Sequence, residues 1–153
     1  MRPLHIRDGS TPTFDAFGVE VRVIVPAAHT DGSLGLFEEI TPPQVGPPLH
    51  RHHQEDEFFR VIEGRYRFRA GDEDVEAGPG DSLLVPRGTP HCFINVGDTP
   101  GRLFMGLTPG GFEGFFARVA AEKLRLPDDM PRIAAIAADF NLEFLGPNPF
   151  WPA

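Results

Sequence analysis

Three of the six histidines lie close together in the segment PPLHRHHQEDEFF at residues 47–59. Alternate side chains of a β-strand point to the same face, so His50 and His52 share one face and His53 lies on the other. Two imidazoles on one face supply half of a metal site. Glu57 can add a carboxylate if a small bend follows His53, and His91, in the segment VPRGTPHCFIN, is the candidate for a fourth ligand.

The carboxylate ligand has an alternative, because other acidic residues directly precede Glu57. If the bend is shorter, Glu55 takes its place. Either set of three neutral imidazoles and one carboxylate leaves a net charge of about +1 on a divalent ion, with one or two coordination positions open. Such donors suit Fe, Mn, Ni, Co, Cu or Zn, and ligand type does not choose among these metals. We therefore expect one divalent metal ion, in a catalytic site that attracts anions.

Short strands are the elements that must position these ligands. The chain contains 17 glycines and 17 prolines, and runs of residues with strand character lie between them. Strands are expected at residues 19–26, 33–40, 57–63, 65–70, 74–77, 82–85, 92–96 and 102–107. Many short strands separated by such turns are typical of an all-β sandwich or barrel.

After residue 111 the apolar periodicity changes to that of helices. One helical face consists of Phe112, Phe115, Phe116, Val119 and Ala120. A second helix is expected to begin near Pro131, with Asp128 or Asp129 as its cap and with Ile133, Ile136, Ala137 and Phe140 as its apolar face. We expect both helices to pack on the outside of the barrel rather than to form a lid over its mouth.

Two segments resemble the signature motifs of the cupin superfamily. The first motif places a glutamate three or four residues after His-X-His and a glycine six residues further on, and it is matched by His50, His52, Glu57 and Gly64. The second is matched throughout by Gly80, Pro86, Gly88, His91 and Asn95. The opening glycine of the first motif is the one departure, because that position falls on Gln44 and the nearest glycine is Gly46.

The resemblance implies an all-β fold, the double-stranded β-helix or jelly-roll barrel of cupins, with a C-terminal helical extension. One cupin domain is expected over residues 1–153, with the barrel at about 19–108 and the helical tail at about 112–142. The resemblance also implies that His50, His52, Glu57 and His91 bind the metal ion. The chain is most similar to small single-domain cupins of the quercetin 2,3-dioxygenase-like type.

Side chains on the inward face of the strands should line a pocket beside the metal. We expect the residues that contact substrate to be Phe37, Phe59, Val61, Phe93 and Phe104. An apolar pocket beside a cation suits a flat or aromatic molecule bound through an anionic oxygen. The resemblance implies a dioxygenase, in which an enolisable, phenolic or flavonol-like substrate reacts with O₂ and Glu57 acts as the base. A metal-dependent isomerase or cyclase and a non-catalytic small-molecule-binding cupin are the alternatives.

Composition and charge narrow the class of partner. The formal net charge is -8, and the 14 Lys and Arg residues form no cluster, which disfavours nucleic acid as a partner. No segment is apolar enough for a membrane span or a secretory signal, so we expect a cytoplasmic protein that binds no membrane. The single cysteine, Cys92, excludes an intramolecular disulfide. An outward-facing Phe58 and the phenylalanine-rich helix indicate a homodimer.

Overall fold

The turns divide the chain into short antiparallel strands, as the glycine and proline spacing predicts. The computed structural model describes residues 1–153. Its strands are β1 (Thr13–Ala16), β2 (Val19–Val25), β3 (Gly35–Thr41), β4 (Leu49–His52), β5 (Asp56–Glu63), β6 (Tyr66–Ala70), β7 (Glu73–Ala77), β8 (Ser82–Val85), β9 (His91–Asn95), β10 (Gly101–Thr108) and β11 (Leu142–Gly146). The helices are α1 (Glu113–Glu122) and α2 (Met130–Asp139), and a single 3-10 turn occupies Ala27–His29.

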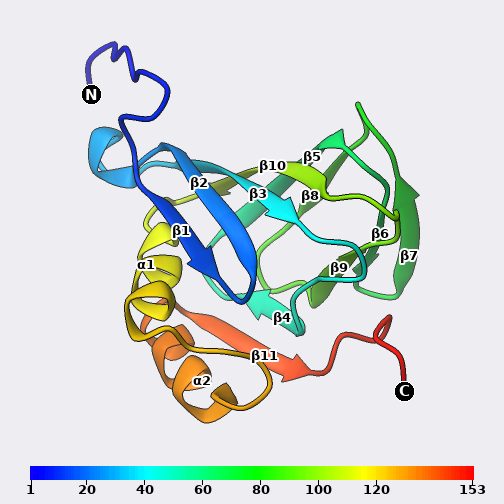
Figure 1. The fold of residues 1–153 in the computed structure, drawn as a ribbon. Coiled ribbons are helices and arrows are strands. Elements are labelled where there is room, and N and C mark those ends of the chain that lie inside the picture. Colours follow the sequence, from blue (N-terminus) through cyan, green and yellow to red (C-terminus); the bar gives the residue numbers. More distant parts are fainter.

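The strands form two antiparallel sheets, which Figure 1 shows wrapped around a common interior. One sheet has the order β1-β2-β3-β10-β5-β8, and the other has the order β11-β4-β9-β6-β7. This arrangement confirms the predicted double-stranded β-helix with a C-terminal helical extension. The sheets extend beyond the expected barrel limits, because β1 and β11 each add an edge strand that the sequence did not reveal as part of a sheet.

Alternation of side chains defines the interior of the barrel. On β3 the buried positions are Gly35, Phe37, Glu39 and Thr41, and on β10 they are Gly101, Leu103, Met105 and Leu107. On β5 the buried positions are Glu57, Phe59 and Val61. Because β10 pairs with both β3 and β5, these three faces form one continuous inner wall.

The helical tail returns the chain to the strand that carries the paired histidines. Helix α1 packs against β1, and α2 packs against β11 (Figure 1). Strand β11 then pairs with β4, with Leu142 opposite His52 and Phe144 opposite His50. Strand β4 therefore lies between β9 and β11, away from the sheet edge. Neither helix has the length and apolar composition that a membrane crossing requires.

Two residues show what the backbone requires in the loop where the first motif departs from the cupin pattern. Gln44 has φ of 61°, a left-handed conformation that favours glycine, which is the residue that the motif places there. Gly46 is required for a different reason. A Cβ atom at Gly46 would lie 1.8 Å from the carbonyl oxygen of Phe93, so the loop before β4 passes too close to β9 for any side chain.

Candidate metal centre

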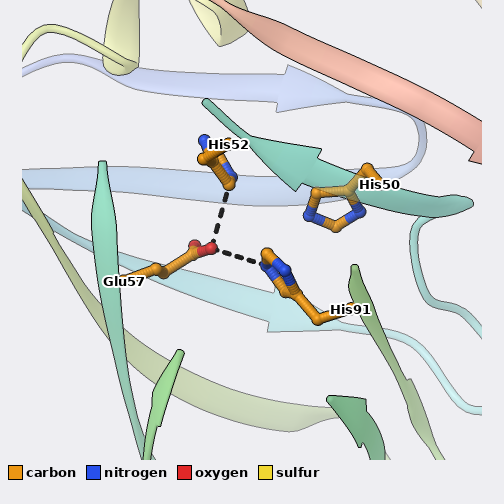
Figure 2. Close-up of side chains that lie close together, drawn as sticks. All are labelled: His50, His52, Glu57 and His91. Carbon is orange, nitrogen blue, oxygen red and sulfur yellow. Dashed lines mark hydrogen bonds and ion pairs between the residues drawn. The ribbon is translucent and has the colours of Figure 1, made fainter. Parts of the chain in front are cut away.

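Four side chains from three strands converge inside the barrel. His50 and His52 come from β4, Glu57 from β5 and His91 from β9, and Figure 2 shows them pointing toward one another. All four are buried, and their potential ligand atoms lie within 4.8 Å of one another. Oε2 of Glu57 lies 2.9 Å from Nε2 of His91 and 3.2 Å from Nε2 of His52. The structure thus brings together the four residues expected to bind metal.

Strand register and one bend produce this convergence. His50 lies directly opposite His91 in the pairing of β4 with β9, and alternation along β4 places His52 on the same face. The chain then bends after His52, and β5 begins at Asp56. This bend is long enough to aim Glu57, not Glu55, at the histidines. Glu55 lies behind His52, with Oε2 3.5 Å from the outer ring nitrogen, Nδ1.

Backbone carbonyls orient two of the imidazoles. Nδ1 of His50 lies 2.8 Å from the carbonyl oxygen of Pro48, and Nδ1 of His91 lies 2.9 Å from that of Thr89. A carbonyl oxygen only accepts hydrogen bonds, so Nδ1 donates in both rings and Nε2 is the nitrogen that faces the other residues of the group. Metal-binding histidines are commonly held in this way. The donor set of three imidazoles and one carboxylate therefore fits a divalent metal ion.

The charges within the group put two of the four residues, His50 and Glu57, in a metal-binding protonation state and favour a proton on His52, which a metal ion would displace. Burial, assisted by His91 and His52, holds the pKa of His50 well below its usual value. Burial also lowers the pKa of His52, but Glu57 and Glu55 outweigh it and raise that pKa to about 9. Burial acts to raise the pKa of Glu57, but His52 and His91 outweigh it and hold that pKa well below the usual range. Glu57 is therefore ionised and His50 neutral, as metal ligands must be.

A cavity of about 230 Å³ adjoins the four residues. His50, His52 and Glu57 lie on its wall, and the rest of the wall is mostly apolar. The aromatic side chains on it, apart from the histidines, are Phe17, Phe93, Phe112, Phe115, Phe116, Phe144 and Trp151. The ring of Phe112 packs edge-on against His52, with 4.6 Å between ring centroids. An apolar ligand in this cavity would therefore lie against the metal centre.

Most of the expected substrate-contact residues lie elsewhere. Phe93 lines the cavity, but Phe37, Phe59 and Val61 are buried in the barrel core and do not. Their side chains belong to the hydrophobic core, in which Phe37 packs against Phe116 and Phe59 packs against Phe68. The expectation for Phe104 is wrong, because it faces outward and packs against Phe58.

Several cavity residues lie where sequence patterns gave little guidance. Met105 occupies the inward position next to Phe104, so a one-residue parity error concealed it. Phe112, Phe115 and Phe116 come from the helical tail, and they close part of the cavity. The expectation that the tail packs only on the outside of the barrel is therefore incomplete. The helical periodicity correctly identified the apolar face of the first helix. It did not show that this face lies against the cavity.

The comparisons with known proteins agree with this fold. The Cupin domain family matches residues 36–106. An uncharacterised protein of Methanocaldococcus jannaschii is 34% identical over 100 residues, which cover 65% of this chain and 74% of that protein. Quercetin 2,3-dioxygenase of Bacillus subtilis is 27% identical over 95 residues, 62% of this chain but 28% of the enzyme.

A solved structure extends the comparison to the fold. The RmlC-like cupin of Shewanella frigidimarina superposes with a TM-score of 0.62 at 18% identity, over 73% of this chain and 96% of that one. At this identity the likeness concerns the fold alone. Together with the sequence matches, it shows that the chain belongs to the cupin superfamily, as a small single-barrel member.

Replacing His91 tests metal binding directly. We expect protein purified without added metal to contain about one divalent ion per chain and His91→Ala to lower the affinity for it by more than about tenfold, because one ligand is lost. Elemental analysis measures the content. His53→Ala is the matched control, since His53 is half exposed and pairs with Glu143 outside the site. Equal metal content in wild type and His91→Ala would refute the assignment.

A second carboxyl group on the cavity wall has unusual surroundings. Glu39 on β3 is buried and forms no hydrogen bond or ion pair with the protein. Burial, reinforced by the charge of Glu57, raises the pKa of Glu39 from 4.5 to about 8. The folded protein therefore keeps a proton on Glu39 at neutral pH, whereas the unfolded chain releases it.

This difference predicts a pH-dependent effect of Glu39→Gln on stability. Between about pH 5 and pH 8, unfolding releases the Glu39 proton, so this residue makes the wild type less stable as the pH rises. We expect the stability of Glu39→Gln relative to wild type to increase by at least about 1 kcal/mol over that interval. Urea denaturation of chelator-treated protein at both pH values measures it. Glu38→Gln, on the outer face of β3, should show no such increase.

Proposed function

We propose that this cupin is a metal-dependent dioxygenase that acts on an enolisable, phenolic or flavonol-like small molecule. The observation that carries the proposal is the position of the buried histidine and glutamate group, which lies on the wall of an aromatic cavity. A site of net charge about +1 attracts an anionic oxygen, and the apolar wall suits an aromatic body. The similarity to quercetin 2,3-dioxygenase supports this choice of chemistry.

Different residues of the chain would have different roles in this reaction. His50, His52, His91 and Glu57 would hold the ion, which supplies positive charge for an enolate or phenolate oxygen and a route for electrons to O₂. Glu57, already ionised, would accept the proton of the substrate hydroxyl at Oε2. Because its pKa is low, it is a weak base, and this favours substrates whose hydroxyl is itself acidic. Phe112 and Phe116 would exclude water from the reacting atoms.

A metal-dependent isomerase or cyclase is the second candidate. The observation that favours it is Glu39, a carboxyl group on the same cavity wall as Glu57. One ionised and one protonated carboxyl group could remove and return a proton without any oxidant. In that chemistry the ion would only polarise a carbonyl group, so zinc would serve as well as a redox-active metal.

Oxygen consumption distinguishes the two candidates. We expect uptake of O₂ that requires both metal and a flavonol or 1,3-diketone, with both atoms of ¹⁸O₂ recovered in the product by mass spectrometry. His91→Ala should lower the rate at least about 100-fold, whereas His53→Ala should leave it unchanged. Turnover by zinc-loaded protein without O₂ would favour the isomerase or cyclase. Binding without turnover across a broad panel would indicate a non-catalytic cupin.

A homodimer is also proposed, from the outer face of the first sheet. Phe58 lies opposite Leu84, and the ring of Phe104 packs against Phe58, so apolar side chains gather on this face. Leu84 is 66% exposed and Ile62 is 41% exposed. Such an exposed patch is typical of an interface.

Light scattering at micromolar concentration tests this proposal. We expect a dimer for the wild type and a monomer for Leu84→Glu, because the substitution would bury a charge in the interface. The matched control is Leu145→Glu, at an exposed apolar position on β11 that lies outside this patch and should remain dimeric. A monomeric wild type would contradict the proposal.

A further inference from the structure

The apolar cavity has polar side chains at a second place, away from the metal centre. Glu39 and Thr41 follow one another on the inner face of β3, and both lie on the cavity wall. Glu39 makes no hydrogen bond or ion pair with the protein. The hydroxyl group of Thr41 is buried beside the phenol of Tyr66, and neither hydroxyl has a hydrogen bond of normal geometry. Buried polar groups without partners are costly and uncommon, so a pair of them on a cavity wall indicates a place for a ligand.

The backbone around the pair is already satisfied. The carbonyl oxygen of Thr41 accepts a hydrogen bond from the side-chain amide of Asn95, at 2.9 Å. Asn95 also donates to the carbonyl oxygen of Thr99 and accepts from the backbone N–H of Gly97. The backbone that carries the two side chains is therefore anchored by hydrogen bonds. Pre-organised groups of this kind bind a ligand without the cost of ordering them.

Strand register separates the pair from the metal centre. Strand β10 lies between β3 and β5, with Leu107 opposite Glu57 and Leu103 opposite Glu39. The two carboxyl groups are thus four residues apart along β10, which corresponds to roughly 13 Å of strand. Their side chains both point into the cavity and shorten this gap. A single small molecule can therefore reach both places.

The charge of the cavity decides what the pair can bind. No lysine or arginine lies on the cavity wall, so no cation compensates an ionised Glu39. In the metal-free protein, burial and the nearby charge of Glu57 keep the Glu39 carboxyl group protonated, with its pKa raised to about 8, and the burial persists when a metal ion is bound. A protonated carboxyl group donates an O–H, and the hydroxyl of Thr41 both donates and accepts. These groups suit an uncharged oxygen and disfavour an anion.

We propose that Glu39 and Thr41 form a second polar subsite, which binds an uncharged carbonyl or hydroxyl oxygen at the end of the ligand opposite the metal-bound oxygen. The inference rests on the proposed function, because it assumes an aromatic ligand with its anionic oxygen at His50, His52, Glu57 and His91. It adds to that function a substrate class, namely aromatic molecules with oxygen functions at both ends. The apolar residues between the two places would hold the rings.

Paired probes test the subsite in zinc-loaded protein, where no turnover by redox chemistry interferes. The probes are 3-hydroxyflavone and its derivatives with one further hydroxyl group on the A or B ring, and calorimetry measures each dissociation constant. We expect at least one derivative to bind the wild type about tenfold more tightly than the parent. Glu39→Leu and Thr41→Val should each bring that ratio toward one, with little change for the parent compound.

Further variants separate the subsite from the metal centre. Glu39→Gln keeps an N–H donor and should preserve part of the preference, whereas Glu38→Gln should preserve all of it. His91→Ala should weaken the binding of the parent compound and of the derivative to the same extent. Equal ratios in wild type, Glu39→Leu and Thr41→Val would overturn the proposal, and so would failure of every flavonol to bind. A ratio that depends on Glu39, together with no O₂ uptake when the protein is loaded with a redox-active metal, would instead refute the dioxygenase and leave the subsite standing.

Discussion

Burial of three imidazoles and a carboxylate at one point in the barrel is the constraint on which the rest of the structure depends. Polar groups are stable in such a place only when their hydrogen bonds are satisfied. His50 and His91 meet this condition locally, because each Nδ1 contacts the backbone carbonyl two residues earlier in the chain. Glu57 contacts two imidazoles at once. The orientation of His50 and His91 is therefore set by neighbouring residues in the chain. The strands bring these histidines together with His52 and Glu57.

The segment after the barrel completes this environment. Strand β11 covers the free edge of β4, and Nδ2 of Asn148 donates to the carbonyl oxygens of Pro47 and Phe93 at 2.8 and 2.9 Å. These contacts tie the loop before His50 to the strand that carries His91. Trp151 then lies on the cavity wall. The C-terminal residues therefore both position the histidines and close the cavity. Substitutions in this segment should alter the geometry of the metal centre.

The features that could be predicted from the sequence are those that depend on a short stretch of the chain. Alternation along one strand placed His50 and His52 together, and the motif spacing found Glu57 and His91, because both follow from short stretches of sequence. The cavity wall was harder to predict, since it depends on the parity of β10 and on where the tail docks. An error of one residue exchanged Met105 for Phe104. Strand β1 was missed because its residues, Thr13–Ala16, show little of the apolar alternation that indicates a strand.

Two carboxyl groups in one cavity are held in opposite protonation states. Glu57 is ionised because His52 and His91 contact it and outweigh the effect of its burial. Glu39 keeps its proton because burial and the charge of Glu57 raise its pKa. The side chains of β10 that lie between them, Leu103 and Met105, are apolar and form no bridge of hydrogen bonds. The separation lets one face of the cavity attract an anion while the other offers a proton to a neutral oxygen. A single apolar barrel can thereby distinguish the two ends of one molecule.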